Sequence, residues 1–183
     1  MSAADRDHWD RRYADGGMAP VGELDPPPAF AEFVDLLPSS GSALDVACGR
    51  GRSTVWLARR GLDTRGVDVS PIAIGFARNL AEAEGLAERC RFDVVDLDGG
   101  LPDGPPVDLI LCHLFRDPRL DGAMKARLTP GGVLAVAVLS EVGAGPGRFR
   151  APPGELCAAF GDLELLAHEE SDGIARLLGR ADG

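Results

Sequence analysis

Residues 43–54, with the sequence ALDVACGRGRST, decide the fold of this chain. The apolar run around Asp45 is typical of a short strand, and it ends at a glycine turn. Gly49 and Gly51 let the backbone turn sharply and approach a ligand with no Cβ in the way. Residues 52–60 then follow a helical pattern that Gly61 closes. This order predicts the first strand and helix of an open α/β sheet.

Strand and helix patterns continue to alternate along the chain. Further strands are expected at 64–69, 91–95, 107–112, 133–139, 163–169 and 174–178, and helices at 29–37, 71–84, 117–128 and 152–160. Such alternation predicts a doubly wound, mostly parallel sheet. The last two strands are separated only by a short turn, which leaves no room for a crossover. We expect a Rossmann-like seven-stranded α/β fold that ends in an antiparallel hairpin at one sheet edge.

The length of 183 residues suits one domain with one hydrophobic core. This size excludes an enzyme with separate cofactor and substrate domains of ordinary size. The content of 45% hydrophobic and 26% charged residues is typical of a globular chain. Residues 1–28 are polar and contain several Gly and Pro, so we expect an N-terminal arm or lid before a single domain at 29–183.

The net charge of −10 disfavours nucleic acid and anionic membrane surfaces as partners. We find no apolar stretch of the roughly twenty residues that a membrane helix needs, and no apolar signal-peptide core. Four widely spaced cysteines without a CxxC pair favour thiols over disulfides or a zinc site: Cys48, Cys90, Cys112 and Cys157. We expect a soluble, cytoplasmic monomer or homodimer without a metal.

Acidic side chains follow the first three expected strands, at the edge where such sheets bind ligands. Asp68 can accept both hydroxyls of a ribose, and Asp96 can accept from the exocyclic amine of a purine. Two alternatives stay open: Asp45 as the ion-pair partner of Arg52, and Asp68 as a helix cap, although Ser70 already fills that position. Other acids of the same loop compete with Asp96, namely Asp93, Asp98 and Asp103.

A glycine turn followed by an acid at the second strand end fits two ligands, NAD and S-adenosylmethionine. The NAD pattern has a third glycine at the position of Thr54. Asp45 would repel a pyrophosphate, whereas it suits the ammonium group of a methionine moiety. These two residues, together with the chain length, favour S-adenosylmethionine.

Five segments resemble, in order and spacing, the motifs of class I S-adenosylmethionine-dependent methyltransferases: ALDVACGRG, GVDVS, FDVVDL, VDLILCHLF and LTPGGVLAVAV. Three others are similar to small bacterial members of the tellurite-resistance and thiopurine methyltransferase-like type. These are the arm at 9–13, the HLFR segment at 113–116 and residues 149–156. Cys48 is a departure, because the family usually places glycine there.

The resemblance implies a role for each matching residue. The methionine and ribose pocket would be shaped by Asp45, Gly49 and Gly51. The ribose and adenine would be held by Asp68, Val69, Asp96 and Leu97. The sulfonium and substrate mouth would be lined by Cys112 and by His113, the candidate catalytic base. A lone histidine after an apolar strand is more often a hydrogen-bonded structural group, and this alternative stays open for His113.

The arm would complete the site. Arg12 would pair with the methionine carboxylate, and Trp9 and Tyr13 would belong to a lid or, alternatively, to the packing face of a helix. Arg116 is a further substrate or lid candidate, unless it only pairs with a neighbouring acid.

The implied function is methyl transfer from S-adenosylmethionine to a small-molecule acceptor by in-line displacement. The acceptor pocket would be built by the arm and residues 141–153. Two alternatives are an inactive S-adenosylmethionine-binding partner subunit and, less favoured, an NAD-binding oxidoreductase.

Overall fold

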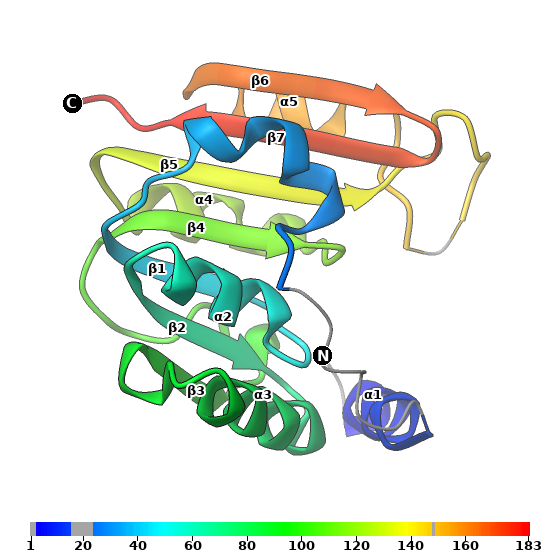
Figure 1. The fold of residues 1–183 in the computed structure, drawn as a ribbon. Helices are drawn as coiled ribbons and strands as arrows, with labels where there is room; N and C mark the ends of the chain where they lie inside the picture. The colour runs from blue at the N-terminus through cyan, green and yellow to red at the C-terminus, as the bar shows by residue number, and fades with distance from the viewer. Residues whose placement is uncertain (1–2, 16–23, 148) are drawn as a thin grey trace.

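The computed structural model describes residues 3–15, 24–147 and 149–183 of the chain (Figure 1). These residues form a seven-stranded sheet with the order β3-β2-β1-β4-β5-β7-β6. The strands are β1 (Gly41–Val46), β2 (Leu62–Asp68), β3 (Cys90–Val94), β4 (Val107–His113), β5 (Leu128–Leu139), β6 (Glu164–Ser171) and β7 (Ile174–Arg180).

Five α-helices and four 3₁₀ helices connect the strands within the described ranges. The α-helices are α1 (Ala3–Asp15), α2 (Arg52–Arg59), α3 (Pro71–Ala83), α4 (Asp121–Ala126) and α5 (Glu155–Phe160). The 3₁₀ helices are η1 (Pro28–Leu36), η2 (Ala87–Arg89), η3 (Leu97–Gly99) and η4 (Pro118–Leu120).

The strand pairing confirms the predicted topology. β1 to β5 pair in parallel, and β7 pairs antiparallel with both β5 and β6. β1 lies at the switch point, because the chain first winds outward through β2 and β3 and then returns to place β4 on the other side of β1. Open α/β sheets bind ligands at this point, beyond the carboxyl ends of the strands.

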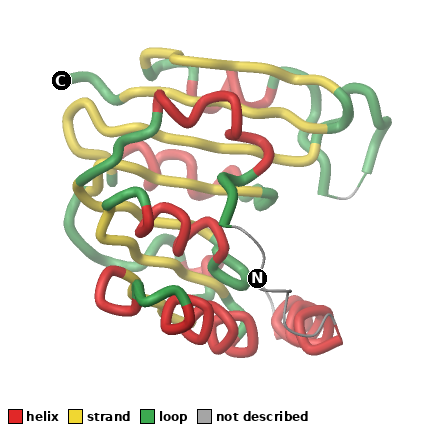
Figure 2. The backbone as a smooth tube through the Cα atoms, in the orientation of Figure 1, coloured by secondary structure: helices red, strands yellow, loops and turns green. Residues whose placement is uncertain are grey.

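Helices cover both faces of the sheet (Figures 1 and 2). Successive strand residues point to opposite faces, so Leu109 packs with Phe30 and Trp56 on one side, and Ile110 packs with Phe160 on the other. This double coverage explains why β4 is apolar throughout rather than alternating.

The predicted helix starts are found at Ser70 and Asp117. The Ser70 hydroxyl accepts from the Ala73 N–H at 3.1 Å, and the Asp117 carboxylate accepts from the Arg119 N–H at 3.0 Å. After Asp117 the chain forms the 3₁₀ turn η4 before α4, rather than one continuous helix.

Several local details differ from the expectations or decide between them. The polar arm is helical over α1, as the alternative interpretation of Trp9 and Tyr13 required, and α1 contacts α3. The helix expected at 29–37 is the 3₁₀ helix η1. The strand expected at 133–139 begins earlier, at Leu128. A bulge takes up the extra residues between Leu128, which pairs with Val107, and Val133, which pairs with Leu109.

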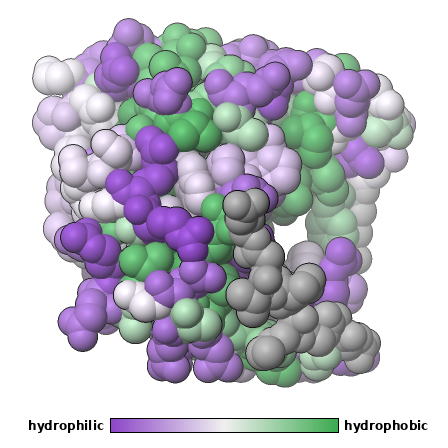
Figure 3. All heavy atoms as spheres, viewed as in Figure 1, coloured by the Kyte–Doolittle hydropathy of each residue, from purple (hydrophilic) through white to green (hydrophobic). Residues whose placement is uncertain are grey.

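No helix in the described part of the chain has the length and apolar character to span a membrane. Hydrophilic residues cover much of the face seen in Figure 3, with apolar patches between them.

Candidate functional site

The turn after β1 is built from residues in the left-handed region. Ala47, Gly49 and Gly51 have φ values of 57°, 53° and 74°. The Cys48 N–H donates to the Val67 carbonyl at 2.9 Å, which ties the turn to β2. Left-handed backbone favours glycine. Ala47 is therefore the non-glycine residue of the turn that stands at a position suited to glycine. The sequence analysis placed this departure from the family pattern at Cys48, and that placement was wrong.

Asp68 joins the ends of β1 and β2. Its carboxylate accepts from the backbone N–H groups of Gly49 and Ser70, each at 2.9 Å. The residue is 4% exposed, and burial raises the pKa of its carboxyl against the effect of these two bonds. A carboxylate offers about four acceptor positions, so Asp68 can accept from further donors while it holds the turn.

Asp45 is the second buried acid of the site. It is 2% exposed, and its carboxylate accepts from the Thr54 hydroxyl of α2 at 2.6 Å. Thr54 is therefore its partner, in place of the ion pair with Arg52 that the sequence left open. Burial, and less strongly the charge of Asp68, raises the pKa of Asp45 to about 7.

Helix α1 lies against this turn, at the edge of the sheet where the parallel strands end (Figure 1). Arg50 Nη2 donates to the Tyr13 carbonyl at 2.6 Å, and the Ser70 hydroxyl donates to Asp10. A β-carbon built on Gly49 would lie 2.9 Å from the Tyr13 hydroxyl oxygen. The structure thus brings the tyrosine of the arm to the glycine turn. Burial, followed by the charge of Asp68, raises the pKa of Tyr13 far above its ordinary value.

The other predicted arm residues lie further out on α1. Trp9 stacks on Tyr13 with ring centroids 5.9 Å apart, and the exposed Arg12 lies over the Trp9 ring at 5.4 Å. Arg50 lies over the Tyr13 ring, 5.7 Å from its centre, and 4.9 Å from the centre of the Phe76 ring.

Gly51 is required by packing. A β-carbon there would lie 2.6 Å from the Ala77 β-carbon and 3.0 Å from the Phe92 ring. A larger side chain at this position would therefore disturb the contact between the turn, α3 and β3. Substitution of Gly51 would report on folding rather than on ligand contact.

The end of β3 carries the third predicted acid. The Val95 N–H donates to the Asp68 carbonyl at 2.9 Å, so the chain leaves β3 beside the end of β2. Asp96 is exposed and accepts from the Asp98 N–H at 3.0 Å, a bond that lowers the pKa of Asp96. Val69 and Leu97, expected near the adenine, are both buried.

Two of the competing acids in this region belong to surface ion pairs. Asp93 pairs with Arg65 at 2.7 Å, and Asp98 pairs with Arg119. Asp96 follows β3 directly and begins η3, and its role toward the adenine amine stays a prediction.

The end of β4 holds Cys112 and His113. Burial raises the pKa of the Cys112 thiol to about 12, and its Sγ donates to the Phe115 carbonyl at 3.3 Å. Burial lowers the pKa of His113, so its imidazole is neutral at pH 7. Leu114 follows with φ 60° and a side chain that is 52% exposed.

Arg116 is used inside the fold. It is bound to both Asp121, with Nη2 donating to Oδ2 at 2.9 Å, and Glu155, and it lies over the Phe160 ring. These partners tie α4 to α5. The alternative interpretation of Arg116, pairing with neighbouring acids, accounts for its contacts.

Sequence analysis missed two contributors to the site, Asp10 and Arg50. Arg50 lies between the two glycines of the turn, a position that could have indicated its proximity to a ligand. Asp10 carried no such indication, because it reaches Ser70 only through the packing of α1 on α3.

The family described as a methyltransferase domain matches residues 43–132, which hold the glycine turn, Asp68 and Asp96. Residues 43–132 therefore form a methyltransferase domain. Ajmaline N-methyltransferase of Rauvolfia serpentina is 36% identical over 110 residues, which are 54% of this chain and 38% of that enzyme. The chain spans less than half the length of the curated relatives it matches.

Solved methyltransferase structures share the fold over nearly the whole chain. TehB from Haemophilus influenzae has a TM-score of 0.75 at 19% identity, over 95% of this chain and 67% of that one. The 1,6-didemethyltoxoflavin-N1-methyltransferase of Burkholderia thailandensis, with bound S-adenosylhomocysteine, has a TM-score of 0.72 at 22% identity, over 99% of this chain and 88% of that one. At these identities the likeness shows the fold alone, so the expected subgroup stays a prediction.

Proposed function

We propose that this methyltransferase binds S-adenosylmethionine beyond the ends of β1 to β4 and transfers the methyl group to a small-molecule acceptor. The observation that carries the proposal is the meeting of two buried carboxyl groups, Asp45 and Asp68, at a left-handed glycine turn. Two of the relatives reported above are named for ajmaline and for 1,6-didemethyltoxoflavin, and these names support a small acceptor.

The residues of the turn fit this cofactor. Asp68 keeps acceptor positions for two ribose hydroxyls, and Gly49 leaves the space of a β-carbon beside it. Asp45, once ionised, suits the ammonium of the methionine moiety. Asp96 at the end of β3 is the proposed acceptor for the adenine amine.

When bound, S-adenosylmethionine supplies an electrophilic methyl group on a cationic sulfonium. In the proposed reaction the acceptor's nucleophilic atom forms a bond to the methyl carbon as the carbon–sulfur bond breaks. The task of the chain is to align the two and to exclude water. His113, neutral at pH 7 at the end of β4, is the proposed group that takes a proton from an acceptor hydroxyl or ammonium.

The arm is the proposed lid. α1 already contacts the turn through Tyr13 and holds Ser70 through Asp10. Because the Tyr13 hydroxyl lies beside Gly49, a cofactor on that glycine requires the tyrosine to shift. The proposed lid extends over residues 1–28, of which 1–2 and 16–23 lie outside the described residues.

Calorimetric titration with S-adenosylmethionine, S-adenosylhomocysteine and NAD tests the cofactor. Asp68→Asn is the sharper variant, because its amide oxygen still accepts from one of the buried N–H groups of Gly49 and Ser70, whereas alanine would leave both without a partner. We expect it to weaken binding by about 10- to 100-fold, the scale of ~1.5–3 kcal/mol for hydrogen bonds to a charged group. Asp162→Asn, an exposed acid paired with Lys125, is the control.

Unchanged affinity in a folded Asp68→Asn variant would show that the ribose lies elsewhere. Binding of NAD in preference to S-adenosylmethionine would contradict the cofactor assignment. Cofactor binding without turnover on any panel of small acceptors would favour the inactive partner subunit.

A further inference from the structure

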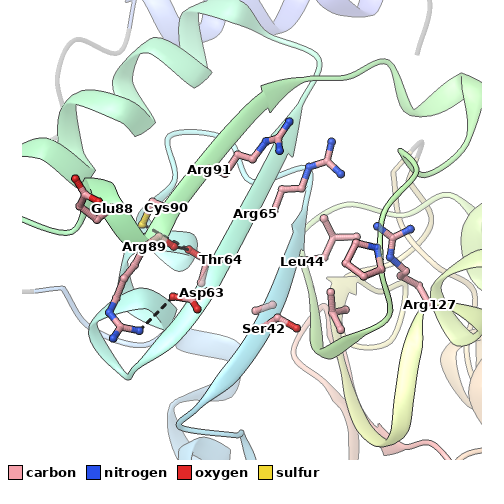
Figure 4. A pocket seen from close by; sticks show the side chains of 13 residues that line it. Ser42, Leu44, Asp63, Thr64, Arg65, Glu88, Arg89, Cys90, Arg91 and Arg127 are labelled. Atoms are coloured by element: carbon pink, nitrogen blue, oxygen red, sulfur yellow. Dashed lines mark hydrogen bonds and ion pairs between the residues drawn. The ribbon is translucent and has the colours of Figure 1, made fainter.

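A cavity opens at the end of the sheet opposite the candidate cofactor site, beside the amino ends of β1, β2 and β3 (Figure 4). Its volume is about 280 Å³. Four arginines line it, although the chain as a whole carries a net charge of −10: Arg65, Arg89, Arg91 and Arg127.

The two acids of the lining belong to one end of this cavity. Figure 4 shows Asp63 and Glu88 on the side of Arg89, and Arg89 is bound to Asp63 at 3.2 Å. Arg65 and Arg127 lie at the other end, on opposite sides of the apolar wall formed by Leu44. The acids of the lining are therefore absent from that end, where Asp93, outside the lining, offsets part of the charge of Arg65.

The guanidinium groups of Arg65 and Arg127 converge on Gly104. A β-carbon built on this glycine would lie 2.2 Å from Arg127 Nη2 and 3.5 Å from Arg65 Nη1. Two cations that approach the same point repel each other unless an anion lies between them. Consistent with this proximity, burial and then the charge of Arg65 lower the pKa of Arg127, while Asp103 acts in the opposite direction.

Their hydrogen-bond donors are only partly used. Arg65 donates through Nε to Asp93 at 2.7 Å and through Nη1 to the Asp103 carbonyl at 2.9 Å, and Arg127 donates through Nη1 to the Pro102 carbonyl at 3.2 Å. Arg127 Nε is buried and has no hydrogen-bond partner. The bonds of Arg127 to the chain thus run through Nη1, and its Nη2, which lies toward Arg65 at Gly104, is the donor of Arg127 that an anion in the cavity would use.

We propose that this cavity binds a small phosphate-class anion, inorganic phosphate or a phosphate monoester, between Arg65 and Arg127. Guanidinium forks match the oxygen geometry of phosphate and bind it through paired, charge-assisted bonds. The volume lies just below the range of about 300–1,000 Å³ that is usual for small-molecule sites, which favours a compact ion over a larger ligand. Arg91, bound to Asp93 only through Nε at 3.2 Å, adds positive charge beside Arg65.

The test is a titration of the ¹⁵N-labelled chain with inorganic phosphate and, separately, with phosphoserine, followed by NMR in a phosphate-free buffer at constant ionic strength. We expect saturable shifts at the amides of 63–65, 90–91, Gly104 and Val107. Arg127→Gln should weaken binding at least tenfold. Arg180→Gln, which removes a half-buried arginine paired with Glu164, is the matched control and should bind as the unmodified chain does.

Gly104→Ala is a second variant, and it keeps every charge. Its new methyl group would displace the Arg127 guanidinium. It should also weaken binding. Saturation by phosphate alone supports the free ion, and saturation by both ligands supports a phosphate monoester site. Shifts that are equal in chloride of the same ionic strength, or unchanged by Arg127→Gln, would overturn the proposal. Affinity for S-adenosylmethionine is measured on the same variants and should stay unchanged, which separates this site from the proposed cofactor site.

Discussion

At the residue scale, Asp45 makes the stability of the chain depend on pH. Its pKa is raised by burial from 3.8 to about 7, so between these values the folded chain holds a proton that the unfolded chain has released. The free energy of unfolding therefore falls as the pH rises through this window.

Asp45→Asn keeps an acceptor for Thr54 and removes the ionisable group. We expect the variant to match the unmodified chain near pH 4 and to be more stable by about 1–3 kcal/mol at pH 8, where the buried charge is fully formed in the unmodified chain. Urea denaturation at both pH values measures the difference, with Asp162→Asn as the control. Equal stability of the variant and the unmodified chain at pH 8 would contradict the assigned pKa.

Ala47 is a second residue whose environment predicts a measurable effect. It is a non-glycine residue with φ 57°, a conformation that costs about 1–2 kcal/mol. Ala47→Gly should raise the free energy of unfolding by about 0.5–1 kcal/mol, since the loss of chain entropy on folding offsets part of the relieved strain.

The control is Ala43→Gly in β1, where the alanine is buried in an extended strand. That change should lower stability, because it removes a packed methyl group and adds backbone freedom to the unfolded state. A loss of stability in both variants would show that the left-handed turn is not strained.

At the element scale, α1 is either a lid or a permanent support of the turn. If it is a lid, its amides exchange quickly in the ligand-free chain and gain protection when S-adenosylhomocysteine binds. If it is a support, they exchange slowly in both states. Hydrogen exchange followed by mass spectrometry distinguishes the two, with α5, on the other side of the sheet, as the internal reference.

Removal of residues 1–15 tests the same element by its consequence. We expect the melting temperature of the ligand-free chain to change by no more than a few degrees, and turnover to be largely lost. A truncated chain that stays fully active, or one that cannot fold, would exclude the lid.

At the scale of the whole molecule, the strand order predicts a gradient of stability. β1, β4 and β5 are each paired with a strand on both sides. Most side chains of β4 are buried, whichever face of the sheet they point to. β3 and β6 lie at the edges, and β6 has few buried side chains. Amides of β4 should therefore exchange slowest and those of β6 among the fastest of the strands, as native-state exchange in low denaturant would measure. Protection of β6 equal to that of β4 would contradict this gradient.

Most of the fold could be predicted from local patterns. The apolar run of β4, the cap at Ser70 and the short turn before β7 each have a cause that acts within a few residues, so the strand and helix order followed directly. The arm was harder, because α1 has no apolar face of its own and is held through Asp10 and Tyr13 against residues far along the chain.

The candidate site also has a part that local sequence determines and a part that depends on tertiary packing. The sequence alone determined which acids stand at strand ends, since the topology of a parallel sheet brings Asp45, Asp68 and Asp96 to one edge. Only the tertiary structure decided what each side chain does there. It assigned Thr54 to Asp45, enclosed Asp68 between two backbone N–H groups, and turned Arg116 inward to Asp121 and Glu155. These outcomes depend on burial and on partners distant in sequence, and the balance between desolvation and a hydrogen bond is set only when the surrounding chain is in place.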